Sequence, residues 1–292
     1  MKNISGARLK IAFLGLGEIG EKCLQAIVDD FEIKFFLIPR NYLSEELKSL
    51  AKNYSLRTHE VKNSADIFQL MKKDRIDLMI VAGCPFLLKK DLLDKPDLGV
   101  INVHTGALPK YRGFHPLPWA IINDEKRIGV TVHMMDEGMD TGDVLLQDCF
   151  EIDESDNIST VRTRACVLGA KLLARVLGNI KDGNLPGKKQ DSSQSSYAPR
   201  RTPRDSQIDW SRTARDIFNL IRASEGSYAA FSYTQDKKKV SIRKSLIKGG
   251  AVTKEQYGEV LDKNDEGYLV GTGDGIIQIE TDAVLDIGDK LI

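Results

Sequence analysis

The sequence has few of the residues that build metal centres and disulfide frameworks. It contains four cysteines and four histidines among 292 residues. The cysteines stand singly, without the paired spacing of a zinc site or a secreted disulfide scaffold, and no two histidines share a ligand spacing on one helix. We therefore expect no metal ion and only reduced, buried thiols, at Cys23, Cys84, Cys149 and Cys166.

Long apolar runs and an excess of one charge sign are also missing. No apolar run approaches the roughly eighteen residues needed to span a bilayer, and residues 1–10 lack the apolar core of a signal peptide. Lys plus Arg and Asp plus Glu both total 42, so no global positive field attracts nucleic acid or anionic lipid. We expect a cytoplasmic protein that uses no membrane.

The chain does have a regular alternation of short apolar runs and amphipathic stretches. The apolar runs predict buried strands and the amphipathic stretches predict helices. This alternation is typical of an α/β fold with a Rossmann-like, doubly wound, mostly parallel sheet. The predicted strands cover residues 10–14, 33–38, 78–82, 99–103, 129–134 and 143–151, and the predicted helices cover 21–28, 45–53, 65–73, 87–93, 119–123 and 159–180.

A change of composition divides the chain. Residues 188–204 are rich in Ser, Gln, Lys, Arg and Pro, which is typical of a linker. We predict a catalytic domain over residues 1–187, a linker over 188–204 and a small β-rich, OB-like barrel domain over 205–292. The last domain has one predicted helix, 214–223, and strand candidates at 230–233, 240–244, 258–262, 268–271 and 276–280.

Gly15, Gly17 and Gly20 form a glycine turn between a predicted strand and a predicted helix, as a dinucleotide-binding fingerprint does. The second strand ends on Pro39 and Arg40 rather than on the acidic residue that an NAD site needs. We favour a purely structural turn. An NADP-dependent reductase, with Arg40 meeting a 2′-phosphate, remains the alternative, and whether the turn contacts phosphate stays open.

The most specific feature is a set of three polar residues, Asn102, His104 and Asp140, placed to meet at one strand end. An amide can donate to a developing oxyanion, and a neutral imidazole can take a proton from an attacking amine. A carboxylate can orient that imidazole and stabilise its charged form. Each residue alone is more often structural, but together they suit acyl transfer to an amine.

The order of motifs around this set resembles the 10-formyltetrahydrofolate-dependent formyltransferases. The resemblance covers residues 10–182 and continues into the second domain, where it is similar to methionyl-tRNA formyltransferase and its sugar-modifying relatives. The motifs are Asn-Val-His at 102–104, Leu-Pro-Lys-Tyr-Arg-Gly at 108–113, Gly-Val-Thr-Val-His at 129–133 and Asp-Thr-Gly at 140–142, followed by the segments 201–205, 208–211 and 219–223.

The resemblance implies a mechanism and a formyl donor. His104 would be the general base, Asn102 would steady the formyl oxygen, and Asp140 would orient His104 and balance its charge. The donor would be 10-formyltetrahydrofolate, with no metal. Its pterin would lie between two loops whose residues are Cys84, Phe86, Leu87 and Leu88 on one side and Asp136, Glu137 and Gly138 on the other. We assign His133 to strand packing.

We expect a small amine as acceptor, most of all a nucleotide-linked amino sugar. A tRNA-binding member should carry a basic track after the linker, but residues 202–292 hold 13 Lys or Arg against 15 Asp or Glu. The tRNA enzymes also carry a basic, glycine-rich insertion after their second strand, which residues 40–44 lack. The candidates for shaping the acceptor pocket, with loop anchoring as their alternative role, are Tyr111, Arg112, Gly113 and Trp119.

Other functions stay open at this level. Methionyl-tRNA and a carrier-tethered aminoacyl group are alternative acceptors for the same chemistry. A folate-binding module without turnover is disfavoured, since all three catalytic residue types are present. The sequence does not reveal the oligomeric state or the role of the second domain.

Overall fold

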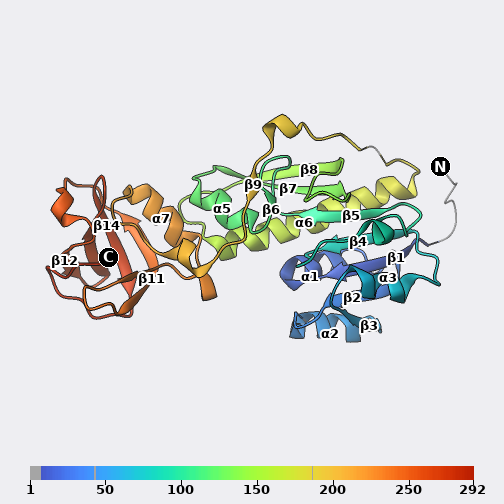
Figure 1. Cartoon of the computed structure of the whole chain (residues 1–292), viewed down its shortest axis with the longest axis horizontal. Coiled ribbons are helices and arrows are strands. Elements are labelled where there is room, and N and C mark those ends of the chain that lie inside the picture. Colours follow the sequence, from blue (N-terminus) through green and yellow to red (C-terminus); the bar gives the residue numbers. More distant parts are fainter. Residues whose placement is uncertain (1–7, 43, 186) are drawn as a thin grey trace. The chain divides into compact units, whose positions relative to one another are not determined.

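The computed structural model describes residues 8–42, 44–185 and 187–292, and Figure 1 shows their helices and strands. The start of the chain, where we expect no leader segment, lies outside this range. The chain divides into two compact units. The first comprises the chain up to Gly113 with Arg127–Glu151 and Arg162–Tyr197, and the second comprises Phe114–Lys126, Ile152–Val161 and Ala198–Ile292. The domain limits expected from composition stay a prediction.

A seven-stranded sheet in the order β3-β2-β1-β4-β5-β7-β8 forms the centre of the first unit. The first five strands of this order run parallel, and β7 and β8 extend the sheet in antiparallel fashion. Strand β4 (Leu78–Ala82) is buried throughout, as expected of a parallel strand covered on both faces. The other strands are β1 (Lys10–Gly15), β2 (Glu32–Pro39), β3 (Thr58–Val61), β5 (Val100–His104), β7 (Arg127–Met134) and β8 (Val144–Glu151).

Helices cover both faces of this sheet, which confirms the predicted α/β, mostly parallel architecture (Figure 1). On the face that carries Val100, the residues Ile67 and Met71 of α3 (Ser64–Met71) join the buried core. On the face of Val103, Gly169 of α6 (Ile158–Lys181) approaches so closely that an added Cβ would lie 2.8 Å from Val103 Cγ1. The remaining helices of this unit are α1 (Gly17–Gln25), α2 (Glu45–Asn53) and α4 (Lys90–Leu93).

The glycine turn has a packing role. A Cβ on Gly20 would lie 2.9 Å from both Gly15 C and Gly15 Cα, and one on Gly15 would lie 2.6 Å from the Phe13 ring. Gly17 has a φ of +58°, which favours glycine. These contacts account for the turn as the structural feature that we favoured, in which α1 starts tightly against β1.

Residues 188–198 form regular hydrogen bonds, although their composition predicts a linker. Lys188 exchanges two main-chain hydrogen bonds with Val144, each 2.9 Å long. The short strands β6 (Arg112–Gly113) and β9 (Tyr197–Ala198) pair, and Arg112 N–H donates to Ser196 O over 2.9 Å. This segment is therefore attached to the loops that follow β5 and precede β8.

The second unit contains a five-stranded antiparallel sheet in the order β10-β11-β14-β13-β12. Its core joins Ile217, Phe218 and Ile221 of one helix to apolar side chains of the strands. This confirms the expected small, β-rich C-terminal domain. The elements are α5 (Pro116–Ile122), α7 (Ala214–Arg222), β10 (Phe231–Tyr233), β11 (Lys239–Ile247), β12 (Val260–Asn264), β13 (Gly267–Gly271) and β14 (Ile276–Thr281).

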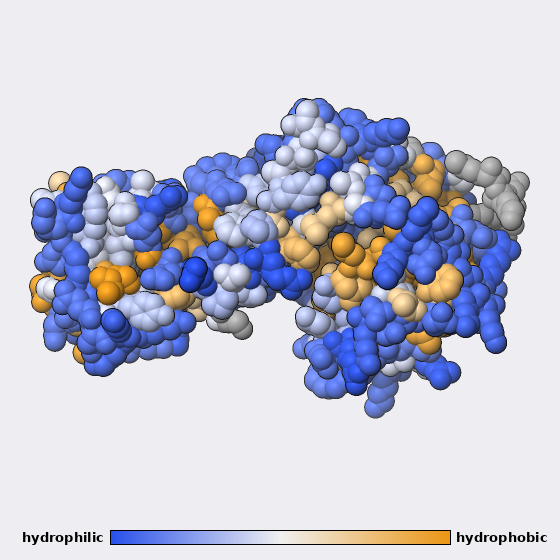
Figure 2. Space-filling model, in the orientation of Figure 1, coloured by the Kyte–Doolittle hydropathy of each residue, from blue (hydrophilic) through white to orange (hydrophobic). Residues whose placement is uncertain are grey.

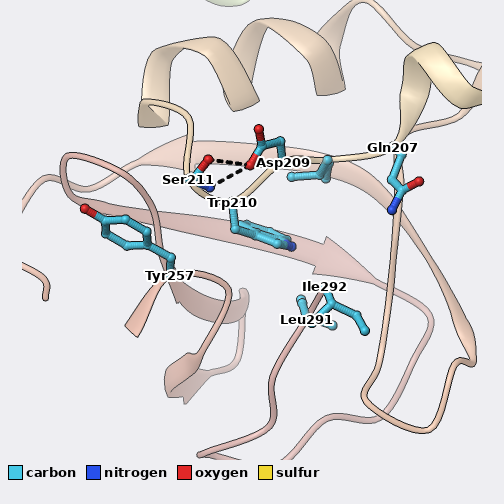
Figure 3. A pocket seen from close by; sticks show the side chains of 8 residues that line it. Gln207, Asp209, Trp210, Ser211, Tyr257, Leu291 and Ile292 are labelled. Atoms are coloured by element: carbon cyan, nitrogen blue, oxygen red, sulfur yellow. Dashed lines mark hydrogen bonds between the residues drawn. The ribbon is translucent and has the colours of Figure 1, made fainter. Parts of the chain in front are cut away.

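A cavity of about 400 Å³ lies in the second unit beside Trp210 and Tyr257 (Figure 3). Asp209 Oδ1 accepts hydrogen bonds from Ser211 N and Oγ, over 3.0 and 2.6 Å, which closes the turn at its edge. The Trp210 indole is buried and donates to Ser232 Oγ over 2.9 Å, so it acts as a core residue. The lining is Gln207, Ile208, Asp209, Trp210, Ser211, Tyr257, Leu291 and Ile292.

Several elements differ from the sequence prediction, among them β6 and β9, where no strand was predicted, and α1, which begins at Gly17 and not at residue 21. Strand β3 was not predicted, because three of its four residues are polar and its pattern lacks the apolar run of a buried strand. The helix predicted over 87–93 begins only at Lys90, because Lys89 N–H donates to Ser64 Oγ and Leu88 turns into the core. In the described part of the chain, no helix combines the length and apolarity needed to cross a membrane.

Candidate active site

Asn102 and His104 lie at the carboxyl end of β5. Side chains two residues apart on a strand share a face, so both project from the same side of the sheet. The antiparallel register of β5 with β7 sets His133 directly opposite Asn102. Residues facing each other in this way have neighbouring side chains, so three polar groups meet at one strand end.

Asp140 reaches the same place from the loop between β7 and β8. Its Oδ1 lies 3.4 Å from Asn102 Nδ2, and its Oδ2 lies 3.5 Å from His104 Nδ1. Gly113 N–H donates to Oδ2 over 2.8 Å. The structure thus brings together the amide, the imidazole and the carboxylate that the sequence marked as catalytic.

The loop that carries Asp140 is closed by its own side chains. Asp136 Oδ1 accepts hydrogen bonds from Gly138 N over 3.0 Å and from Thr141 Oγ1 over 2.5 Å. Asp140 itself has a φ of +54°, in the left-handed region that Asp tolerates better than most residues. This conformation lets a short loop point the Asp140 carboxylate back at the end of β5.

A main-chain carbonyl sets the tautomer of His104. Nε2 of this ring lies 2.8 Å from Tyr111 O, and because a carbonyl oxygen only accepts, Nε2 carries the proton. The neutral ring therefore keeps its lone pair on Nδ1, which faces Asp140 Oδ2. Nδ1 is the atom that can take up a proton, and the carboxylate can stabilise the imidazolium that results.

His133 belongs to this cluster, which the sequence reading missed. Its Nδ1 donates to Met134 O over 2.7 Å, so Nε2 accepts, and Nε2 lies 3.1 Å from Asn102 Nδ2. Asn102 Nδ2 thus has two acceptors, His133 and Asp140, and its amide orientation is fixed. The signal that would have found His133 is the predicted strand 129–134, once it is paired with the strand that carries Asn102.

Burial and charge tune the two ionisable partners. Burial lowers the pKa of His104 below its ordinary value of 6.5, while Asp140 raises it and His133 lowers it. Burial raises the pKa of Asp140, but His104, His133 and the Gly113 N–H together outweigh this and hold it well below the ordinary 3.8. At neutral pH the site therefore pairs a neutral imidazole with a charged carboxylate.

The residues predicted to hold the pterin lie on two neighbouring loops. Cys84 and Phe86, after β4, pack against the same buried cluster as Met135, which precedes the Asp140 loop. Asp94 holds the pKa of Lys90 above its ordinary value, and Glu137 on the second loop adds to this effect.

The first of these loops offers an apolar wall. Leu87 is 62% exposed, whereas Leu88 is buried and Cys84 is half-buried. Burial raises the pKa of the Cys84 thiol to about 11, so the thiol is neutral, and it donates to Phe86 O over 3.0 Å. Figure 2 shows apolar side chains, in orange, gathered over the region of β4 and β5. An exposed apolar surface beside main-chain polar groups fits a flat heteroaromatic ring.

The four candidates for the acceptor pocket have different settings. Arg112 is buried, and its Nε and Nη2 donate to Gln190 Oε1 over 3.1 and 2.8 Å, which favours loop anchoring over phosphate pairing. The Gly113 N–H donates to Asp140 Oδ2, and the Tyr111 carbonyl accepts from His104 Nε2. Trp119 belongs to the second unit, where its Nε1 donates to Pro199 O over 2.8 Å.

Two family models match this chain. Residues 35–177 match the model described as formyl transferase, and residues 200–283 match the C-terminal domain of formyl transferases. Curated relatives cover nearly the whole chain. The methionyl-tRNA formyltransferase of Clostridioides difficile is 32% identical over 93% of this chain and 91% of its own. That of Pelotomaculum thermopropionicum is 40% identical over 74% of this chain and 68% of its own.

Solved structures share the fold. The sugar 3N-formyl transferase WlaRD, crystallised with dTDP and 5-N-formyl-THF, superposes with a TM-score of 0.74 at 23% identity, over 96% of this chain and 100% of its own. An N-formyltransferase from Helicobacter canadensis in complex with folinic acid and dTDP-3-aminofucose gives a TM-score of 0.72 at 23% identity, over 94% and 99% of the two chains. The chain therefore belongs to the formyl transferase family and is a 10-formyltetrahydrofolate-dependent formyltransferase.

Proposed function

We propose that this enzyme formylates the primary amine of a small acceptor, a nucleotide-linked amino sugar, and that Asn102, His104 and Asp140 carry out the transfer. The observation that carries the proposal is the pairing of His104 Nδ1 with Asp140 Oδ2 at 3.5 Å, with the tautomer set by Tyr111 O. This pair can remove a proton from an amine at neutral pH.

Each residue has a defined task in the transfer. Bound 10-formyltetrahydrofolate supplies the formyl carbon. The acceptor nitrogen adds to this carbon and its oxygen takes up negative charge, and the bond to the donor nitrogen then breaks as the carbonyl re-forms. His104 Nδ1 accepts the proton that the acceptor nitrogen loses and returns it to the departing donor nitrogen. Asp140 stabilises the imidazolium between these two events, so the buried positive charge has a negative partner.

Asn102 donates to the formyl oxygen as negative charge develops on it. In the structure its Nδ2 has two acceptors, at 3.1 Å on His133 and at 3.4 Å on Asp140. The bond to Asp140 is long and weak, so the Asn102 hydrogen that makes it is the one that turns to the oxyanion. The bond to His133 keeps the amide oriented during the exchange.

The charge of the second unit supports a small acceptor. A tRNA needs several free cations to neutralise its phosphates. Here many cations of residues 202–292 already have acidic partners, and this part of the chain is slightly acidic overall. The ion pairs are Arg212 with Asp216, Arg215 with Glu154, Lys238 with Asp236, Arg243 with Asp282 and Lys244 with Glu280.

The connection after the second strand also favours a small acceptor over tRNA. Strand β2 ends at Pro39 and α2 begins at Glu45, with Ser44 as its N-cap. This leaves no room for the basic, glycine-rich insertion expected of a tRNA-binding member. Among proteins of the same fold, the H. canadensis enzyme was crystallised with an amino sugar nucleotide, dTDP-3-aminofucose.

Methionyl-tRNA is the second candidate, because the curated relatives at 30–32% identity over 93% of the chain are methionyl-tRNA formyltransferases. A carrier-tethered aminoacyl group is a third acceptor for the same chemistry.

The cytoplasmic location stays a prediction from the sequence. The family assignment leaves no support for the NADP-dependent reductase.

An acceptor panel tests the proposal. The enzyme is incubated with 10-formyltetrahydrofolate and either nucleotide-linked amino sugars, charged initiator tRNA or an aminoacylated carrier protein, and release of tetrahydrofolate is followed. We expect release with at least one amino sugar and none with tRNA. Release with tRNA alone would refute the small acceptor while leaving the formyl-transfer chemistry intact.

A further inference from the structure

Gln190 lies in the segment that composition marks as a linker, yet its side chain is fully hydrogen bonded. Its Nε2 donates to Asp140 O over 2.8 Å and to Gly142 O over 2.7 Å. Its Oε1 accepts from Arg112 Nε and Nη2 over 3.1 and 2.8 Å. A side-chain amide has two hydrogens and two lone pairs, so all four positions of Gln190 are used.

These four bonds join the two segments that hold the catalytic pair. On one side is the loop that presents Asp140. On the other is β6, where Gly113 N–H donates to Asp140 Oδ2 and the preceding Tyr111 carbonyl accepts from His104 Nε2. If the loop moved away from β6, the carboxylate would leave its contact with His104.

The same segment also fastens β6 directly. Ser196 O accepts from Arg112 N over 2.9 Å, and Ser196 Oγ accepts from Tyr111 N over 3.0 Å. Lys188 pairs with Val144, at the end of the Asp140 loop. Residues 188–196 therefore span from one segment to the other, and Gln190 is the side chain that bonds to both.

We propose that Gln190 is a positioning residue for formyl transfer, which clamps the Asp140 loop to β6 and so keeps the Asp140 carboxylate against His104. The proposal rests on the proposed function only through the roles of His104 and Asp140, and not on the identity of the acceptor amine. Misplacement of a catalytic group by about 1 Å can cost about 100-fold in rate, so a clamp of this kind matters for turnover.

Two variants separate the bonds that Gln190 makes to the Asp140 loop from those that it makes to Arg112. Gln190→Ala removes all four bonds. Gln190→Glu keeps an acceptor for Arg112, and forms an ion pair with it, but has no N–H groups for the carbonyls of Asp140 and Gly142. The second variant keeps the segment attached should the first fold poorly. Gln194→Ala is the matched control, because Gln194 lies on the same segment and its side chain donates to Asp191 Oδ2 of that segment rather than to either catalytic loop.

The pKa of His104 gives a readout that a merely structural role would not change. The titratable groups that face His104 are Asp140, which raises its pKa, and His133, which lowers it. If the carboxylate retreats, the raising contribution is lost and the pKa falls. NMR titration of the four histidines in the unliganded protein measures this without any turnover, in folded samples checked by circular dichroism.

We expect Gln190→Ala and Gln190→Glu to lower the pKa of His104 and to reduce kcat by about tenfold or more, with the KM for the folate donor little changed. Gln194→Ala should match the wild type in all three. An unchanged or raised pKa of His104 in both Gln190 variants would overturn the proposal. Loss of the mechanism itself would look different, because His104→Ala would then remain fully active.

Discussion

At the scale of single residues, the chemistry depends on the proton positions of His104. The Tyr111 carbonyl holds the proton of Nε2, so Nδ1 is the base in the proposed mechanism, and Asp140 Oδ2 lies 3.5 Å from it. Burial keeps the ring neutral at physiological pH, and the carboxylate stabilises the imidazolium that forms during the reaction. The pair thus has a different charge state at rest and after proton uptake.

The pH dependence of kcat/KM should follow from this arrangement. Only the neutral imidazole can act as base, so activity falls as the pH drops through the pKa of His104. Because burial lowers that pKa below 6.5, the acid limb should lie below pH 6.5. A limb centred above the ordinary pKa of histidine would contradict the burial argument.

Asp140→Asn should move the acid limb of the pH–rate profile to still lower pH. Removing the carboxylate removes an interaction that raises the pKa of His104, so the limb shifts to lower pH. At the same time kcat should fall by about 10²–10⁴-fold, because the imidazolium loses its partner. A pH–rate profile of both proteins with the same acceptor tests this, and an upward shift in the variant would be inconsistent with the pairing.

At the scale of elements, the site depends on where strands end and how closely their neighbours pack. β5 ends in Asn102 and His104, and the pairing of β7 supplies His133. Close approach of α1 to β1 through Gly15 and Gly20 fixes the first turn of the same sheet edge. Substitutions that push these elements apart should act on stability before they act on chemistry.

Gly20→Ala should destabilise the protein by about 1–3 kcal/mol, because its Cβ would meet the backbone of Gly15 at 2.9 Å, which cannot yield as a side chain could. Gly178→Ala in α6 is the matched control. Nothing lies within 4 Å of a Cβ there, so the substitution should stabilise the helix by about 0.5–1 kcal/mol. Urea unfolding measures both, and equal effects would argue against close packing at the turn.

Sequence patterns predicted most elements because apolar runs and amphipathic periods mark buried strands and covering helices. They missed β3, whose residues Thr58 to Glu60 are polar at the edge of the sheet. Their assignment of residues 188–204 to a linker stays a prediction, but composition does not reveal that Gln190 bonds to two loops. They missed His133 because its role arises only from strand register.

At the scale of the whole molecule, charge distinguishes the candidate acceptors. The chain has no net charge, and residues 202–292 are slightly acidic. A polyanion such as tRNA binds through released counterions, and its affinity therefore falls steeply with salt. A nucleotide-linked sugar carries few charges and should respond weakly.

The value of kcat/KM for the physiological acceptor should fall by less than about tenfold between roughly 50 and 200 mM salt. A ligand with six to ten phosphate contacts would lose about 10³–10⁵-fold over the same range. Steady-state kinetics at several salt concentrations measure the slope. A loss of about 1,000-fold would indicate a nucleic-acid acceptor and contradict our assignment.

The most direct test of the central claim is His104→Ala, compared with His59→Ala. His59 lies on β3 beside Phe35 and has no part in the site. We predict that His104→Ala loses about 10²–10⁴-fold in kcat while the affinity for 10-formyltetrahydrofolate stays near that of the wild type, and that His59→Ala keeps its turnover. Wild-type turnover in a folded His104→Ala protein would contradict the account.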